Sequence, residues 1–216
     1  MSKPKRTTSL ATVRRRYQYL INTPLVSERR IQRFLEKYPI LLPVSWPLEN
    51  RVFSQFTLAG QKTPDFVFAR EDSLGIRWHF IEIEKPWNRG FTKKGDPTAE
   101  MSHALRQIHD WHTFMIDNRD YVLRHFPFKR QMNRLGLAEP EFTLILGRRD
   151  DLNDQTRALA RRLSSHNLAL MSFDRLINRL GSPLYDENEP LRSCRFANGK
   201  FIELASVGMK VTYTFD

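Results

Sequence analysis

The sequence predicts an α/β fold of a single domain, in which helices flank a mixed β-sheet. Three strand-like segments follow one another closely, at residues 50–58, 64–69 and 77–84, and they predict an antiparallel meander. Two further apolar segments, 142–147 and 168–173, each follow a predicted helix, an arrangement that favours parallel pairing. The length of 216 residues suits one domain with a substantial core rather than two domains.

Helices are predicted before the meander and around the later strands. The first covers residues 28–37, where apolar side chains recur at helical spacing after the candidate N-cap Ser27, and Pro39 and Pro43 end it. The other three are predicted to start at Asp96-Pro97, at Asn153 or Asp154, and at Asp174, and to end near residues 117, 165 and 180. The basic stretch 124–136 is predicted to be mobile.

Positive charge is concentrated near the N-terminus. The formal net charge is +11, and residues 1–16 contain six basic residues and no acidic one. We therefore predict a flexible basic arm in which Arg14, Arg15 and Arg16 contact nucleic-acid phosphates. The alternative is a solvated tail that aids solubility.

Three parts are predicted along the chain. Residues 1–24 form the basic arm, residues 25–182 form the folded domain, and residues 183–216 form a C-terminal extension. Because residues 210–215 alternate between β-branched or aromatic residues and polar ones, the extension is predicted to contain an extra strand.

The composition predicts a cytoplasmic protein that does not enter a membrane. Cys194 is the only cysteine, so no internal disulfide can form and a reducing compartment is expected. No apolar run reaches the roughly 18–20 residues that a membrane span needs. The N-terminus also lacks the apolar stretch of a signal peptide.

Three acidic residues lie at neighbouring ends of two predicted strands. Asp65 begins the segment 64–69, and Glu82 and Glu84 lie at the end of the segment 77–84. Because strand side chains alternate between faces, Glu82 and Glu84 point the same way. Carboxylates beside apolar neighbours are costly to bury unpaired, and a divalent cation is a common partner. The alternative is a turn and an edge strand with solvent-facing glutamates.

Asp65 with its preceding proline, together with Glu82-Ile83-Glu84, resembles the PD-(D/E)XK motif of restriction-endonuclease-like nucleases. The resemblance implies a restriction-endonuclease-like core and a Mg²⁺-dependent deoxyribonuclease, in which Mn²⁺ can substitute. Asp65 and Glu82 would then be metal ligands, with the carbonyl of Ile83 as a third. Most members have lysine at the third motif position, where this chain has Glu84, which is expected to bind metal or activate water. Lys85, one residue later, faces the opposite side of a regular strand and is expected to be accessory.

Longer stretches resemble the Shedu-type nuclease domain over about residues 25–180. They are Ser27 through Leu42, Pro64-Asp65-Phe66, Phe80 through Pro86, Gln107 through Trp111, Leu146 through Arg149, and Ser172 through Ile177. This resemblance implies an enzyme that cuts or nicks DNA in bacterial anti-phage defence, often as a homo-oligomer. Two alternatives remain open: a catalytically degenerate DNA-binding or assembly module of the same fold, and a mobile-element or repair nuclease.

Further candidate residues follow from this resemblance. Glu28 is a candidate metal ligand, and Gln107 is a candidate for orienting water or phosphate. Arg89, Lys93 and Lys94 are candidate DNA contacts. The alternatives are a first-turn acid that complements the helix dipole at Glu28, a polar residue at the core edge at Gln107, and a solvated loop for the three cations.

Other polar residues are given structural roles. His103, His109 and His112 share one predicted helix, but their spacing is a poor zinc signal, so surface or structural roles are expected. Arg148 and Arg149 are predicted to belong to the scaffold, with a contact to DNA as the alternative.

Overall fold

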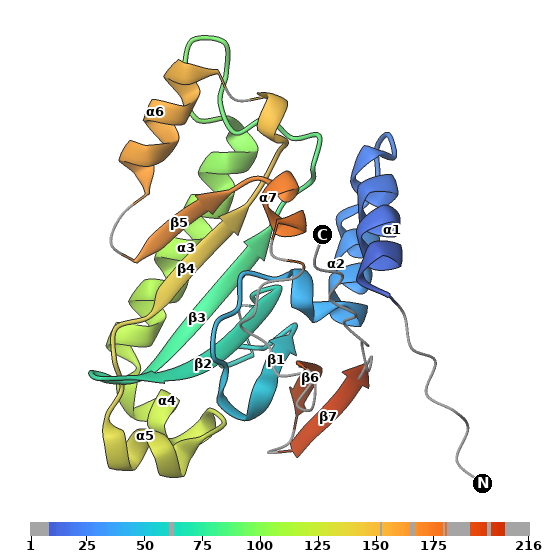
Figure 1. The fold of residues 1–216 in the computed structure, drawn as a ribbon. Helices are drawn as coiled ribbons and strands as arrows, with labels where there is room; N and C mark the ends of the chain where they lie inside the picture. The colour runs from blue at the N-terminus through green and yellow to red at the C-terminus, as the bar shows by residue number, and fades with distance from the viewer. Residues whose placement is uncertain are drawn as a thin grey trace, which may run out of the picture.

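A seven-stranded mixed β-sheet organises the part of the chain that this computed structural model describes (Figure 1). The described residues are 9–60, 63–151, 153–164, 167–178, 180, 191–197 and 200–205. The strands are β1 (Arg51–Ser54), β2 (Phe66–Asp72), β3 (Gly75–Ile83), β4 (Glu141–Ile145), β5 (Leu168–Met171), β6 (Arg192–Ala197) and β7 (Lys200–Ala205). They lie in the order β5-β4-β3-β2-β1-β6-β7.

The strand pairing confirms the predicted mixed sheet. β1, β2 and β3 form the antiparallel meander, and β4 and β5 extend it in parallel from β3. On the other side, β6 pairs in parallel with β1 and in antiparallel with β7. The β6–β7 hairpin was not predicted, because charged residues interrupt its apolar pattern. The predicted strand at 210–215 lies outside the described residues.

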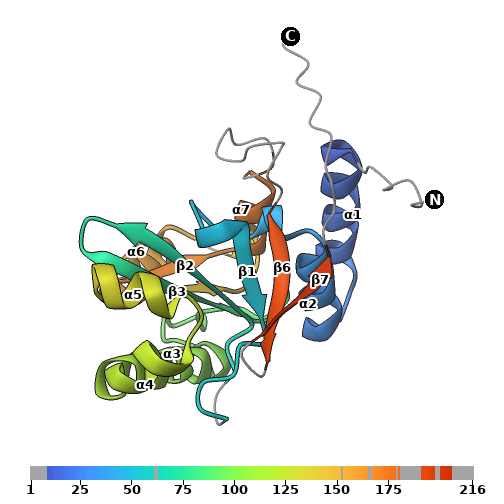
Figure 2. The same cartoon turned by 90° about the horizontal axis from the view of Figure 1, so that it is seen from below.

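Helices cover both faces of the sheet, as predicted (Figure 2). The α-helices are α1 (Leu10–Asn22), α2 (Glu28–Lys37), α3 (Ala99–Asp117), α4 (Arg119–His125), α5 (Lys129–Leu135), α6 (Asp154–Leu163) and α7 (Phe173–Ile177). Within the described residues, no helix combines the length and the apolar character that a membrane crossing requires. This arrangement is a single α/β domain, consistent with a restriction-endonuclease-like core.

Two hydrophobic cores result, one on each face of the sheet. On one face, Phe66 and Ile81 pack with buried side chains of α1, α2 and α7. On the other face, Trp78 and Phe80 pack with buried side chains of α3, α4 and α5. Because side chains of β3 alternate between these two cores, the face of every β3 residue is determined.

The N-terminal helix α1 corrects the prediction of a flexible arm for residues 10–22, whereas residues 1–8 of the predicted arm lie outside the described residues. The side chain of Ser9 accepts a hydrogen bond from the Thr12 amide at the start of the helix. Val13, Tyr17 and Leu20 recur at helical spacing and are buried against the core. The basic residues on the same helix obscured this apolar stripe in the sequence.

Two further corrections concern helix positions. The stretch 124–136, predicted to be mobile, contains the end of α4 and the whole of α5. Helix α3 begins after Thr98, whose hydroxyl accepts from the Met101 amide, and not after Asp96. The Asp96 carbonyl instead accepts a hydrogen bond from the Thr92 amide, within the preceding loop.

Of the two later helices, α6 starts where it was predicted to start, whereas α7 starts earlier than predicted. Asn153 caps α6, since its side chain accepts a hydrogen bond from the Thr156 amide. Helix α7 follows Ser172, so Asp174 lies within its first turn and not at its N-cap. The Asp174 carboxylate instead accepts hydrogen bonds from the Arg148 side chain and the Arg149 amide.

Candidate functional site

The strand β2 begins beside the end of β3, and this register brings the predicted acidic residues together. Phe66 pairs with Ile81, so the preceding residue, Asp65, lies beside Glu82. The Asp65 carbonyl accepts a hydrogen bond from the Gln55 amide. Its carboxylate accepts one from the Ile83 amide at 3.0 Å. The Asp65 side chain therefore replaces a backbone partner at the end of β3 and is held in place.

Glu82 extends from the face of β3 that α3 covers. Ile81 and Ile83 on either side of it belong to the core under α1 and α2, and Phe80 belongs to the opposite core. Alternation along the strand therefore places Glu82 with Phe80. Asp65 and Glu82 are 6% and 8% exposed. Neither forms an ion pair with a described lysine or arginine residue, so two buried acids lie side by side.

The burial of these two acids changes their protonation. The pKa of Asp65 is raised to about 7, mainly by burial, although the hydrogen bond from the Ile83 amide opposes this shift. Burial and the charge of Asp65 raise the pKa of Glu82 well above its ordinary value. A hydrogen bond between the two side chains accompanies these shifts, and both shifts favour a protonated form of the pair.

Two more acids lie around this pair. Glu84 is half-buried, and its pKa is raised by burial and by the charge of Glu28. Burial also raises the pKa of Glu28, at the start of α2, while the charge of Lys85 lowers it. The four acids, which come from two strand ends and one helix start, thus form one electrostatic cluster. The charge of Lys85 acts on both Glu28 and Glu84 and lowers the pKa of each.

One side of α3 runs along the acidic cluster. The Trp111 ring lies 6.3 Å from the Phe80 ring, centroid to centroid, and His103 is close enough to lower the pKa of Glu84. Gln107 lies one helical turn from each, so helical geometry places it between them, at the level of Glu82. His103 is exposed, in agreement with its predicted surface role, but its place near Glu84 was not predicted. The four-residue spacing to Gln107 was the sequence signal for a shared side of the helix.

Asn88, also missed in the sequence, supports Glu84. Its side-chain amide donates to the Glu84 carboxylate at 3.3 Å. Gly147, just after β4, has a φ of +65° and packs against Asn88, where an added Cβ would lie 2.8 Å from the Asn88 carbonyl oxygen. Only glycine permits this close approach, because any other residue would place a Cβ against the Asn88 carbonyl. The contact holds the loop after β3 against the end of β4.

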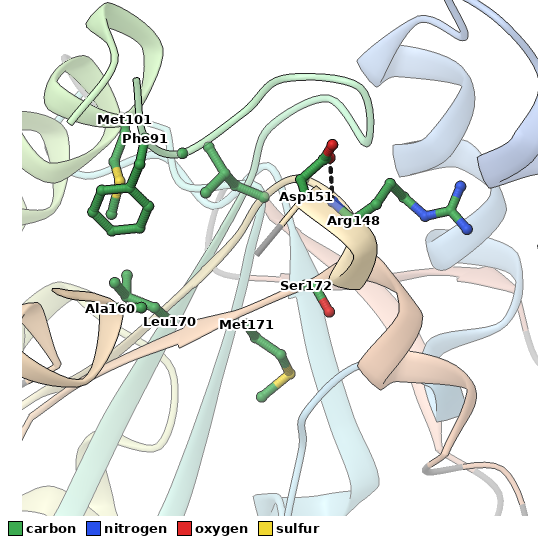
Figure 3. Close-up of a pocket in the computed structure, with 11 residues that line it drawn as sticks. Phe91, Met101, Arg148, Asp151, Ala160, Leu170, Met171 and Ser172 are labelled. Carbon is green, nitrogen blue, oxygen red and sulfur yellow. Dashed lines mark hydrogen bonds between the residues drawn. The ribbon is translucent and has the colours of Figure 1, made fainter. Parts of the chain in front are cut away.

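Arg148 belongs to the scaffold, as predicted. A small pocket of about 50 Å³ lies beside it, lined by side chains that include Phe91, Met101 and Leu170 (Figure 3). The guanidinium group of Arg148 points away from this pocket toward α1 (Figure 3). It donates to the carboxylate of Asp174 and to the carbonyl of Ile21. The pocket is far smaller than the roughly 300 Å³ of typical small-molecule sites.

The predicted DNA-contacting cations lie in two places. Arg89, Lys93 and Lys94 are exposed on the connection between β3 and α3, which extends beyond the carboxyl ends of β3 and β4 (Figure 1). Arg89 lies 3.7 Å from Asp151, an exposed contact that contributes little stability. The predicted arm residues Arg14, Arg15 and Arg16 are instead exposed on α1.

Metal ligation was predicted for Asp65, Glu82, Glu84, Glu28 and the Ile83 carbonyl. Among the residues that the structure describes, no group of three or more His, Cys, Asp and Glu side chains is arranged to hold a metal ion. The structure does bring together two buried carboxylates and the main chain of one strand end. The larger ligand set stays a prediction.

Comparison with known proteins identifies the family. The family described as Shedu protein SduA, C-terminal, matches residues 26–177, which is most of the chain. The match covers the acidic cluster and the helix α3 that runs along it. No curated protein matches the chain. The chain therefore belongs to the family of Shedu protein SduA C-terminal domains.

Proposed function

We propose that this protein is a metal-dependent DNA endonuclease or nickase whose active site is the acidic cluster around Asp65 and Glu82. The main support is the burial of these two carboxylates side by side without a described cationic partner. Such an arrangement disfavours two negative charges in the free protein and would be relieved by a bound cation. Membership of the Shedu family suggests a role in anti-phage defence.

The donor set suits a hard divalent cation. Mg²⁺ is usually bound through one or two carboxylates and keeps several waters, so a third acidic ligand is not required. Asp65 and Glu82 would hold the ion, with the Ile83 carbonyl as a main-chain ligand. When bound, Mg²⁺ or Mn²⁺ neutralises charge on a phosphodiester and favours ionisation of water.

The surrounding residues have separate roles in this proposal. Glu84 accepts the proton of the attacking water, because burial and the neighbouring Glu28 raise its pKa above the ordinary value and make it a stronger base. Gln107 orients the water or a phosphate oxygen from α3. Lys85 limits the repulsion between Glu28 and Glu84, since its charge lowers both pKa values.

DNA would approach across the carboxyl ends of β3 and β4. Arg89, Lys93 and Lys94 are exposed on the loop that extends beyond these strand ends (Figure 1). Cations at such positions contact phosphates and set the position of the duplex without reading its sequence.

A plasmid assay tests the proposed site. Supercoiled DNA is incubated with the protein in Mg²⁺, in Mn²⁺ or in excess chelator, and the open-circular and linear products are measured. We expect metal-dependent conversion by the wild type and a loss of about 100-fold or more in Asp65→Asn and in Glu82→Gln. Both substitutions keep the side-chain shape. Asp120→Asn, at an exposed position on α4, is the control and should cut normally.

Two results would refute the proposal: no metal-dependent cleavage by the wild type, or cleavage that both site variants retain in full. The alternative, a degenerate DNA-binding module, is favoured by one feature, Glu84 in place of the usual lysine. It predicts DNA binding without cleavage in every metal. The expected homo-oligomer is tested separately, by light scattering of the purified protein.

A further inference from the structure

A groove of about 630 Å³ lies between α1 and α2. Its charged lining consists of Arg15 and Arg16 from α1 and Arg30, Arg33 and Lys37 from α2, with Tyr19 beside them. The α1 arginines were predicted to lie in a flexible arm, and no role was predicted for those of α2. The structure combines both sets in one surface.

The groove has a single sign of charge. Among the described residues, no acidic one lines it. Glu36, the acid nearest in sequence, lies on another side of α2, where it accepts a hydrogen bond from Ser54. None of the five groove cations forms an ion pair with a described residue. Arg16 donates to the Tyr38 hydroxyl at 3.4 Å, which orients one guanidinium group without neutralising it.

The cations of α2 form a row. Arg30, Arg33 and Lys37 are spaced by three and four residues, so they lie on one side of the helix and span about 10 Å along its axis. Glu28, which belongs to the acidic cluster, projects from nearly the opposite side of α2, because successive residues turn by about 100°. A linear polyanion along this row would therefore lie apart from the acidic cluster.

Aromatic rings adjoin these cations. Tyr19 is 71% exposed, although it lies within the charged groove. Phe34 also lines the groove and packs against the rings of Tyr17 and Tyr38, at centroid distances of 5.9 and 4.8 Å. Cations interleaved with an exposed aromatic ring are typical of surfaces on which unpaired bases stack.

We propose that this groove binds single-stranded nucleic acid. The five cations contact successive phosphates, and Tyr19 stacks on an unpaired base. A paired duplex has no free base face to offer Tyr19, so the aromatic ring favours a single strand. The proposal does not depend on nuclease activity, because the groove lies on a different side of α2 from the acidic cluster.

Binding is tested in chelator, so that no cleavage takes place. The full chain is titrated into fluorescently labelled 20-mers of deoxythymidine and of uridine and into a duplex of equal length, and anisotropy is measured at several salt concentrations. The variants are Arg30→Gln/Arg33→Gln and Tyr19→Ala. Arg130→Gln/Arg134→Gln is the matched control, because both arginines are exposed on α5 and neither lines the groove. Unchanged melting temperatures verify that each variant is folded.

We expect the double variant to bind the single strands at least about tenfold more weakly, with a salt slope lower by about 1.4 for two lost phosphate contacts. Tyr19→Ala should weaken single-strand binding by about fivefold or more and leave duplex binding unchanged. Comparison of the two single strands shows whether DNA or RNA binds more tightly.

Three results would overturn the proposal. The first is equal binding by the wild type and the double variant. The second is an equal loss in Arg130→Gln/Arg134→Gln, which would show a diffuse effect of charge. The third is an effect of the double variant on the duplex alone, together with no effect of Tyr19→Ala, which would make the groove a duplex contact.

Discussion

At the scale of single residues, Asp65 connects the local structure of a strand end to the proposed chemistry. Its carboxylate takes the place of a backbone acceptor for the Ile83 amide, so the side chain cannot turn toward solvent. The same placement buries it beside Glu82 and raises its pKa to about 7. A group in this position is unfavourable when charged, and this cost is the basis for proposing a cation.

The first prediction concerns the stability of the metal-free protein as a function of pH. The pKa of Asp65 is raised from an ordinary 3.8 to about 7, so the folded state holds a proton that the unfolded state has lost. The stabilising effect is fully present below about pH 4 and is lost as the pH rises through about 7. Asp65→Asn cannot ionise at this position, so its stability does not fall with the ionisation of residue 65. We expect it to be more stable than the wild type by on the order of 3 kcal/mol near pH 8, and similar near pH 4.

Denaturant unfolding in chelator measures this difference, with Asp120→Asn as the exposed control. A free-energy difference between Asp65→Asn and the wild type that stays constant across this pH range would contradict the prediction. Added Mg²⁺ should stabilise the wild type near pH 8, since a ligand that binds only the folded state adds stability. It should not stabilise Asp65→Asn to the same degree.

At the scale of elements, α1 is part of the fold although its surface resembles a basic tail. Tyr17 is fully buried, and its hydroxyl donates to the Phe173 carbonyl of α7 at 3.0 Å. Tyr19, two residues later, is largely exposed. One helix therefore supplies core contacts on one side and the basic groove on another.

The second prediction compares these two tyrosines. Tyr17→Ala should reduce the free energy of unfolding by about 3–5 kcal/mol, because it removes a buried ring and leaves the Phe173 carbonyl without its partner. Tyr19→Ala should change it by less than about 0.5 kcal/mol. Chemical denaturation measures both. Equal and small effects would show that α1 is the dispensable arm that the sequence suggested.

At the scale of the whole molecule, Arg148 joins three distant parts of the chain. It lies after β4 and donates to the Asp174 carboxylate of α7, to the Ile21 carbonyl and to the Asn22 side chain at the end of α1. These contacts join α1 to the carboxyl ends of the central strands. The acidic cluster lies at the same ends of the sheet, so the network stabilises its surroundings.

The third prediction tests this network. Arg148→Met keeps most of the aliphatic side chain but removes the charged hydrogen bonds, and it should reduce stability by about 2 kcal/mol. For a chain of this size, the melting temperature should fall by about 4–8 °C. Arg149→Met is the control, because Arg149 is exposed and only its amide contacts Asp174. Similar melting temperatures for the two variants would contradict the proposed role of Arg148.

Local patterns in the sequence were sufficient for most elements and for the acidic motif. Alternation of side chains identified the meander, and helical spacing identified α2 and α3, because both periods are properties of the nearby chain. The positions of Asp65 and Glu82 at neighbouring strand ends followed from the same patterns. The resemblance to the Shedu family also rested on the order of short motifs, and the family match confirmed it.

Only the tertiary structure decided which of these elements share a surface. The burial of α1, the pairing of β6 with β1 and the approach of Glu28 to Glu84 all depend on contacts between residues far apart in the chain. Such contacts form where two apolar faces or two strand edges remain uncovered, and no local period records that choice. The sequence by itself thus determined the fold class and the acidic motif, whereas the tertiary structure decided that Arg14, Arg15 and Arg16 belong to a packed helix.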